Sequence, residues 1–145
     1  MSIYKSAKKG RFIPKNPGKW AQKNIIFRSG IERRYFNYFD LNSNILKIAS
    51  EQIVIPYYDP VKGKKRKYYV DIIIKYRTKD GDIKVKLVEI KSSSEARPPK
   101  KSKNRVAYER KMLTWLTNKA KWDAASQWAK RKNVEFVVLT ERDIQ

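Results

Sequence analysis

Three residues near the centre of the chain could together support metal-assisted hydrolysis. Asp71 precedes Glu89 by 18 positions, and Lys91 stands two positions beyond Glu89. Two carboxylates can bind a hard divalent cation, which lowers the pKa of a bound water and neutralises charge developing on a phosphodiester oxygen. We predict Asp71, Glu89 and the backbone carbonyl of Ile90 as ligands of Mg²⁺, with Mn²⁺ as a substitute. Lys91 is the predicted group that positions or activates the attacking water.

The residue types that the chain lacks narrow the chemistry further. It has no cysteine and no histidine, which excludes disulfides, thiolate zinc sites and nucleophiles activated by histidine. An enzyme built from this chain must therefore use carboxylates, lysine and a hard metal ion.

The spacing of the motif is weak by itself, because a lysine-rich β protein can contain Glu-x-Lys by chance as a cross-strand salt pair. Its placement is more informative. Residues 66–77 and 83–91 are rich in β-favouring residues and flank Asp80-Gly81, which predicts a β-hairpin. Asp71 lies inside the first predicted strand, and Glu89 lies near the end of the second.

The turn of this hairpin decides whether the two carboxylates can meet. A two-residue Asp80-Gly81 turn would place Asp71 opposite Ile90, with Glu89 on the other face of the sheet. A three-residue loop over 79–81, with the glycine in the left-handed conformation, instead pairs Asp71 with Glu89. We predict the three-residue loop.

With this register both faces of the hairpin are partly apolar, so helices should cover both. Asp71, Glu89 and Lys91 then share a face with apolar neighbours. Buried carboxylates are costly unless they are paired or bind a metal. The arrangement therefore favours a cation at this end of the hairpin.

The remaining pattern predicts an α/β fold. We expect a first helix over 30–39 and a strand over 51–58 before the hairpin, and a mobile loop over 92–104 after it. Residues 105–132 should be helical, either as one helix or as two helices broken near 117–118. A final strand is expected over 134–140. Strand, helix and strand at the end form a crossover, which normally makes the two strands parallel. The predicted order is αβββαβ, with a mixed central sheet flanked by helices.

The charge balance points to a polyanionic partner. The chain has 35 lysine and arginine residues against 14 acidic ones, a formal net charge of +21. We predict DNA as the partner. No apolar run approaches the roughly 18 residues that a membrane span needs, so we expect no membrane association.

The basic residues cluster in places that predict phosphate contacts. Residues 1–28 contain eight basic residues and no acidic one, interrupted by proline and glycine, and we expect an irregular N-terminal arm followed by one domain over 29–145. Phe12 and Trp20 in this arm are candidates for stacking on bases. The predicted DNA-binding residues are Lys9, Arg11, Lys15, Arg28, Lys64, Lys65, Arg66, Lys119 and Lys121.

Lys119 and Glu32 each allow two interpretations. Lys119 falls on an aromatic stripe of the second helix, so its ammonium either reaches a phosphate near the metal or extends over apolar surface into solvent. Glu32 lies on the inward side of the first helix and is a candidate third catalytic carboxylate. Ser29-x-x-Glu32 is also a capping-box pattern, in which the glutamate returns to the Ser29 amide without any metal.

Several segments resemble the head completion nucleases of T4-type phages, within the PD-(D/E)XK nuclease superfamily. The resemblance covers nearly the whole chain, and the segments that carry it are 9–17, 27–29, 53–57 and 118–122. It implies a restriction-endonuclease-like fold, DNA hydrolysis, and a role in completing phage heads. Val70 departs from the pattern, because it stands where the superfamily has a proline.

The sequence leaves the biological setting open. The expected activity is an endonuclease with little base specificity, acting in the host cytoplasm or in association with the virion. Two alternatives remain: a non-catalytic protein that binds DNA or the phage portal or head, and a branch-specific, resolvase-like or transposon-end nuclease on the same fold. Metal-dependent cleavage of defined DNA forms separates the three.

Overall fold

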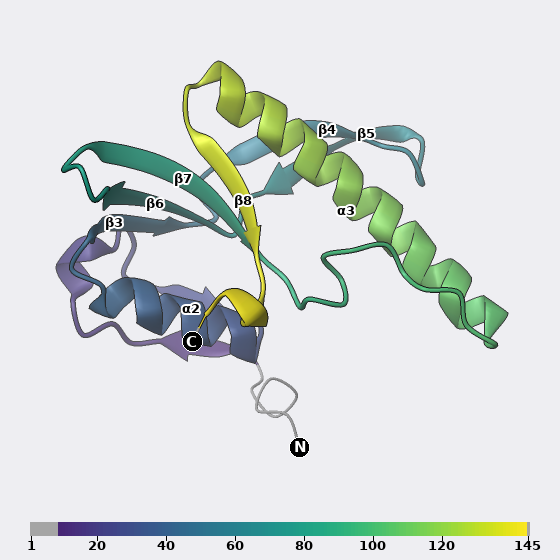
Figure 1. The fold of residues 1–145 in the computed structure, drawn as a ribbon, viewed down its shortest axis with the longest axis horizontal. Helices are drawn as coiled ribbons and strands as arrows, with labels where there is room; N and C mark the ends of the chain where they lie inside the picture. The colour runs from purple at the N-terminus through teal and green to yellow at the C-terminus, as the bar shows by residue number, and fades with distance from the viewer. Residues whose placement is uncertain (1–8, 145) are drawn as a thin grey trace.

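The computed structural model describes residues 9–144 and places a four-stranded sheet between two helices (Figure 1). The first three strands in the sheet order β3-β6-β7-β8 are antiparallel, and β8 runs parallel to β7. This arrangement confirms the predicted mixed α/β sheet and its parallel crossover. The strands are β3 (Ile45–Ser50), β6 (Ile72–Arg77), β7 (Ile83–Ile90) and β8 (Glu135–Leu139).

The two helices cover opposite faces of the sheet (Figure 1). α2 (Gly30–Leu41) is slightly longer than predicted, and α3 (Arg105–Arg131) is a single unbroken helix. Alternation along β6 and β7 sends Ile72 and Val88 into the cluster under α2, and Leu87 into the cluster under α3. No helix in residues 9–144 is long and apolar enough to cross a membrane.

The β6–β7 turn has the predicted three-residue form. The Thr78 amide donates to the Asp82 carbonyl (2.8 Å), and the Gly81 amide donates to the Thr78 carbonyl (3.0 Å). Gly81 has φ of +86°, the left-handed conformation that glycine adopts without steric cost. The register along the hairpin is constant, so its continuation places Asp71 opposite Glu89 as predicted.

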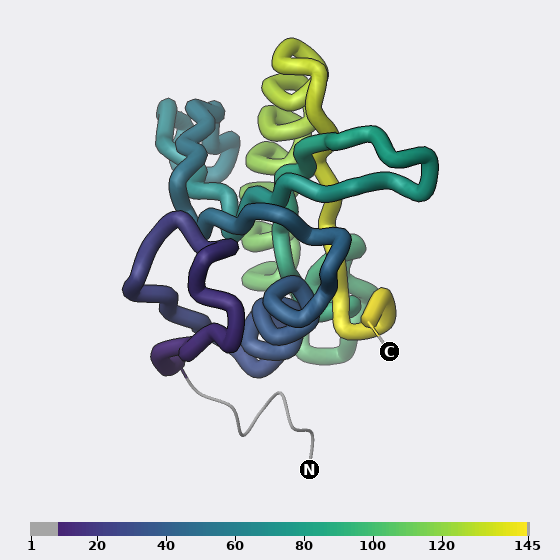
Figure 2. The backbone as a smooth tube through the Cα atoms, turned by 90° about the vertical axis from the view of Figure 1, so that its left-hand side faces the viewer, coloured from purple at the N-terminus to yellow at the C-terminus, as the bar shows by residue number. Residues whose placement is uncertain are grey.

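The strands before β6 differ from the prediction. The first strand of the central sheet is β3, which the sequence analysis did not identify. The predicted strand over 51–58 is instead β4 (Val54–Asp59), and the predicted run over 66–77 divides into β5 (Lys64–Tyr69) and β6. β4 and β5 form a separate antiparallel hairpin that lies against α3, away from the β6–β7 hairpin (Figure 2).

The division between β5 and β6 occurs at Val70 and Asp71, where the chain passes from one sheet to the other. The Val70 amide donates to the Ile53 carbonyl (3.0 Å), and the Glu51 amide donates to the Asp71 carbonyl (3.2 Å). These bonds hold together the two segments that connect the hairpin to the central sheet. β propensity is high on both sides of this point, which explains why the change of sheet was not predicted.

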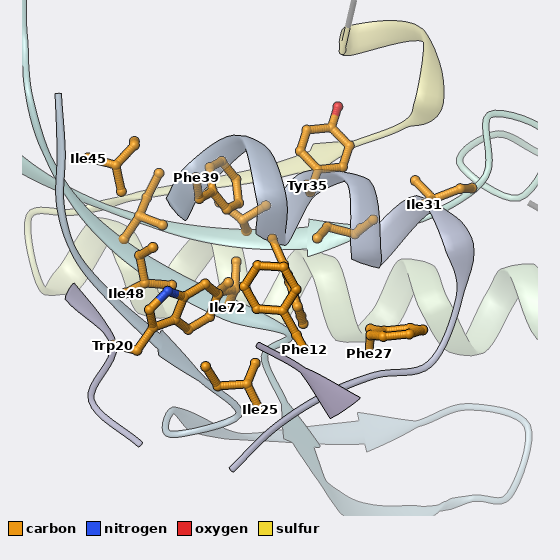
Figure 3. Close-up of a cluster of buried hydrophobic side chains, with 14 residues drawn as sticks. Phe12, Trp20, Ile25, Phe27, Ile31, Tyr35, Phe39, Ile45, Ile48 and Ile72 are labelled. Atoms are coloured by element: carbon orange, nitrogen blue, oxygen red, sulfur yellow. The ribbon is translucent and has the colours of Figure 1, made fainter. Parts of the chain in front are cut away.

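The described part of the N-terminal segment is folded, in contrast to the irregular arm that we expected. β1 (Gly10–Phe12) pairs with β2 (Ile25–Phe27), with a 3-10 turn, η1 (Pro17–Lys19), between them. Phe12 and Trp20 are buried in the cluster under α2 (Figure 3), with ring centroids 5.4 Å apart. They are core residues and do not present their rings to bases. Residues 1–8 lie outside the described residues.

A buried carboxylate ties this segment to the end of α2. Asp40 is fully buried, and its oxygens accept hydrogen bonds from the amides of Lys15 (2.8 Å) and Asn16 (3.1 Å) and from the indole of Trp20 (3.1 Å). The Lys19 ammonium in turn donates to the backbone carbonyl of Asp40 (2.8 Å), near the end of α2 where carbonyls lack helical partners. Polar contacts therefore fix the position of this segment.

We predict that Asp40→Ala destabilises the protein by about 2–4 kcal/mol, because it leaves buried donors without an acceptor. Urea denaturation measures the change. Asp123→Ala, which removes an exposed aspartate on α3, should stay within about 0.5 kcal/mol of the parent. Equal stabilities of the two variants would contradict the anchoring role of Asp40.

Candidate active site

Asp71 and Glu89 lie side by side where β6 begins and β7 ends. Asp71 Oδ2 accepts a hydrogen bond from the backbone amide of Ile90 (2.9 Å). Glu89 is 4% exposed, and its Oε2 accepts a hydrogen bond from the indole nitrogen of Trp122 in α3 (3.0 Å). The hairpin register brings the carboxylates together, and one donor fixes each of them.

The acidic pair carries charge that the described residues do not neutralise by direct contact. Burial raises the pKa of Asp71 well above its usual range, and the neighbouring Glu89 carboxyl raises it further. None of the ion pairs found within residues 9–144 involves Asp71 or Glu89. Two adjacent buried carboxylates without a cationic partner are the electrostatic environment that a metal ion stabilises.

Tyr68 in β5 adds a buried oxygen next to this pair. Its side chain is 4% exposed, and its hydroxyl lies close to Glu89 but within hydrogen-bond geometry of no residue among 9–144. Burial raises the pKa of Tyr68, and the charges of Glu89 and Asp71 raise it further. A buried polar atom without a partner often marks a place for a water molecule or an ion.

The donor set fits a small hard cation. Within residues 9–144 no group of three or more histidine, cysteine, aspartate or glutamate side chains is arranged to hold a metal. Mg²⁺ is commonly held by only one or two carboxylates, and completes its shell with water and substrate phosphate oxygens. Asp71 and Glu89 supply that number. The carbonyl of Ile90 stays a predicted additional ligand.

Basic side chains gather beside the acidic pair. Lys121 of α3 is half-buried, with its ammonium 5.9 Å from the centre of the Tyr68 ring. Burial lowers the pKa of Lys121, the charge of Glu89 opposes this effect, and the charges of Lys91 and Arg66 reinforce it. Lys121 therefore lies within electrostatic range of Glu89, and of Lys91 and the Asp59-bound Arg66, so a phosphate group would be attracted to this place.

The structure separates Lys119 from Lys121. Lys119 is exposed and forms an ion pair with Asp123 one turn along α3 (3.1 Å). The interpretation in which Lys119 reaches inward is therefore wrong. Lys121 takes the inward position, on a part of the helix where Trp122 is buried.

The other predicted DNA contacts lie on two sides of the molecule. Lys64 and Lys65 are exposed on β5, and Arg66 of the same strand contacts Asp59 (3.4 Å). Three further residues lie directly before β1, in β1 and in the loop after it, in the layer of α2 on the opposite face of the sheet from α3 (Figure 1). They are Lys9, Arg11 and Lys15.

Glu32 has a capping position close to the acidic pair. The Ser29 hydroxyl accepts a hydrogen bond from the Glu32 amide (3.1 Å), as predicted, but the Glu32 carboxylate accepts from the Arg28 amide (3.4 Å), one residue before the expected Ser29. Burial raises the pKa of Glu32, Arg28 opposes this effect, and the charges of Glu51 and Glu89 reinforce it. The catalytic role of Glu32 stays a prediction.

Arg28 is already engaged by an acidic side chain. Its guanidinium forms a two-pronged ion pair with Glu51, in which the contact from Nη2 measures 3.1 Å. Glu51 directly follows β3 and has φ of 55°, a left-handed conformation that is uncommon outside glycine. Contact of Arg28 with DNA would compete with this ion pair.

Two comparisons with known proteins agree with this arrangement. Residues 42–141 match the family described as TnsA-like endonuclease N terminal. The chain belongs to this endonuclease family. It is also 35% identical, over 139 residues, to the head completion nuclease of Enterobacteria phage T4, covering 91% of this chain and 90% of that protein. The resemblance to head completion nucleases and the restriction-endonuclease-like fold predicted from the sequence are therefore confirmed.

The departure at Val70 has a structural explanation within this TnsA-like domain. The Val70 amide donates a hydrogen bond to the Ile53 carbonyl (3.0 Å), and the side chain is buried in the cluster under α3. Proline has no amide hydrogen and could not make this bond. A residue with a free amide therefore joins the β4–β5 hairpin to Asp71, which directly precedes β6.

Trp122 and Tyr68 have no predicted role in the site. Trp122 belonged to the aromatic stripe of the predicted helix, which indicated burial but not a hydrogen bond to Glu89. Tyr68 lies in β5, and its position near Asp71 depends on the unpredicted change of sheet between β5 and β6. Tyr68 and Val70 are buried and the intervening Tyr69 is exposed. This alternation is the sequence signal that could have placed Tyr68 on the same side of the chain as the buried Val70.

We predict that the metal-free protein loses stability as pH rises above the usual carboxyl range near 4. With its raised pKa, folded Asp71 retains a proton that the unfolded chain has already lost, so folding becomes less favourable until pH passes that pKa. Asp71→Asn should weaken this dependence and raise the melting temperature at pH 7 in chelator by a few degrees, at roughly 3 °C per kcal/mol. Thermal unfolding followed by circular dichroism measures both effects.

The matched control is Asp123→Asn, which changes an exposed acid and should leave the pH profile unaltered. Added Mg²⁺ should stabilise the parent and Asp123→Asn, but not Asp71→Asn. Equal stabilisation of all three proteins by Mg²⁺ would exclude Asp71 as a ligand.

Proposed function

We propose that the chain is a divalent-metal-dependent endonuclease that hydrolyses DNA phosphodiester bonds with little base specificity. The observation that carries this proposal is the buried Asp71–Glu89 pair, which has no ion-pair partner in residues 9–144 and lies beside Lys91 and Lys121. Membership of an endonuclease family supports it. The acidic pair provides a cation site, and the adjacent lysines provide a phosphate site.

Each of these residues has a proposed role. Asp71, Glu89 and the Ile90 carbonyl hold Mg²⁺, or Mn²⁺ in its place. When bound, such an ion lowers the pKa of a coordinated water and neutralises charge on a phosphodiester oxygen. Lys91 orients the attacking water, and the hydrogen bond between the Lys91 amide and the Leu139 carbonyl (3.0 Å) fixes the backbone at that position.

Two observations support DNA as the substrate: the positive charge around the site and the similarity to the T4 head completion nuclease. The lysine and arginine side chains near the site suit phosphates, and phosphate contacts carry no direct sequence information. Slight base specificity follows from such contacts. The T4 relative is called a head completion nuclease, and we propose that this chain likewise acts on phage DNA during head completion, in the host cytoplasm or on the virion, in contact with head or portal proteins.

We predict that Asp71→Ala and Glu89→Ala each reduce DNA cleavage by more than about 100-fold, beyond the roughly 10–100-fold cost of losing an outer partner of a metal ligand. DNA affinity should stay the same or increase slightly, because each change removes negative charge near a phosphate. Supercoiled, linear, single-stranded and branched DNA, incubated with Mg²⁺, Mn²⁺ or chelator, measures cleavage and substrate preference together. Asp123→Ala serves as the control and should retain full activity.

Unchanged nicking by Asp71→Ala, or activity that persists in chelator, would refute the proposed metal-dependent mechanism. DNA binding without cleavage under every condition would indicate a non-catalytic binding protein. Strong preference for branched DNA would indicate a resolvase-like enzyme with the same site.

We predict different consequences for the two residues of the α2 cap. Glu32→Gln preserves a carbonyl that can accept from the Arg28 amide, but removes a negative charge near the acidic pair. It should reduce turnover strongly and change the melting temperature little. Ser29→Ala removes the N-cap acceptor and should cost about 1 kcal/mol of stability with cleavage retained. Normal cleavage by Glu32→Gln at low Mg²⁺ would leave Glu32 with a capping role alone.

A further inference from the structure

A cavity of about 560 Å³ lies between the first half of α3 and the segment that follows β7. Figure 1 shows this segment passing beside α3 before the helix begins. The volume lies within the roughly 300–1,000 Å³ typical of ligand pockets. The side chains that matter for its chemistry are Arg97, Lys100, Arg110, Lys111, Trp115 and Asn118.

Asn118 is the most unusual residue of this cavity. It is only 6% exposed and lines the cavity, and its side-chain amide, which bonds to no residue among 9–144, stays accessible to solvent. A few polar groups of this kind in a pocket commonly fix the orientation of a ligand. An amide offers both a donor and an acceptor, which matches the edge of a nucleobase.

The remaining lining combines an aromatic ring with positive charge. Trp115 is partly exposed and lies one turn before Asn118 on the same side of α3, where a flat ring can stack against it. Four cations line the cavity against one carboxylate, that of Glu95, which accepts a hydrogen bond from the Ser92 hydroxyl (2.9 Å). The cavity therefore offers a stacking surface, a hydrogen-bonding amide and an excess of positive charge.

The cavity is linked to the candidate active site by one ring contact and one hydrogen bond. Trp115 packs edge-on against Trp122 with ring centroids 5.9 Å apart, and Trp122 donates to Glu89. The segment that lines the cavity also starts directly after Lys91. A group bound in the cavity would therefore be connected to a phosphate at the acidic pair by a short length of its own backbone.

We infer that this cavity binds the base of an unpaired nucleotide next to the bond that is cut, so the preferred substrate is a DNA end or flap with single-stranded character. This inference rests on the proposed nuclease function and specifies its substrate. A base inside a duplex is stacked and paired, and cannot enter a concave pocket unless it leaves the helix. An unpaired base stacks on Trp115 and bonds to Asn118, while the four cations contact its flanking phosphates.

The test measures binding in chelator, so that it does not depend on cleavage. Fluorescence anisotropy with the full chain compares a blunt duplex, a duplex with a short single-stranded overhang, and the same duplex whose overhang consists of abasic sugar-phosphates. The intact overhang should bind roughly 5- to 100-fold more tightly than the abasic one, the range that corresponds to one stacked base. The two overhangs carry the same number of phosphates, so charge alone predicts equal affinity.

Variants then assign the preference to the cavity. Trp115→Ala and Asn118→Leu should each remove most of the preference for the intact overhang and leave blunt-duplex affinity unchanged. Trp128→Ala is the matched control, since Trp128 lies in the same helix but outside the cavity. It should retain the preference even if it lowers stability.

Equal binding of the intact and abasic overhangs by the parent protein would overturn the inference without any variant, so a poorly folded Trp115→Ala cannot obscure the result. An equal loss of affinity for all three DNAs in Asn118→Leu would also overturn it. Cleavage that requires Asp71, together with no preference for the intact overhang, would leave the proposed nuclease intact and refute only the cavity's role.

Discussion

The three-residue turn between β6 and β7 sets the direction of the side chains at the middle of the sheet. Gly81 adopts a positive φ there, and the hairpin keeps one register from the turn to the start of β6. A turn shorter by one residue would reverse the faces of one strand, and Glu89 would point into the apolar cluster under α2. The meeting of Glu89 with Asp71 therefore depends on the conformation of a loop at the far end of the hairpin.

The rest of the site holds two carboxylates in place without neutralising them. The Ile90 amide fixes Asp71 and the Trp122 indole fixes Glu89, and both donors are neutral. Neutral donors orient a carboxylate but leave its charge available for a cation, at a cost in stability that the two apolar clusters on either side must offset. The hydroxyl of Tyr68 is likewise a buried polar group without a hydrogen bond, a local violation of normal packing that is expected mainly at functional sites.

The elements that could be predicted have strong local patterns. Aromatic periodicity marked α2 and α3, and Asp80-Gly81 between β-favouring runs marked the β6–β7 hairpin with its register. β3 was missed because its pairing shifts between Ile45 and Lys47, so its buried residues do not alternate regularly. The N-terminal segment was misjudged because its burial depends on long-range contacts to Asp40 and Phe36, which no local pattern reveals.

Within the site, the types of the acidic residues and their pairing followed from the sequence, but the neighbours contributed by other elements did not. Lys119 and Lys121 illustrate the difficulty. Both lie in α3, a single unbroken helix, and the aromatic residues do not mark the same buried face along its whole length. The second half of α3, with Trp122, Ala125 and Ala129, is the part that is fully packed against the sheet. The inward lysine, Lys121, lies over the rings of Tyr57 and Tyr68 in the β4–β5 hairpin, which the pattern did not separate from the core strands.

The attachment of that hairpin has a consequence for how such a domain can diversify. The chain leaves the central sheet after β3 and returns at β6, and a hydrogen bond between the Glu51 amide and the Asp71 carbonyl closes the two ends of the excursion. This bond does not involve the residues of the β4–β5 hairpin. Residues can therefore be gained or lost at the hairpin tip around Gly63 while β3 and β6 stay in register. A change in length at this tip would thus alter the exposed basic surface of β5 without moving Asp71 or Glu89.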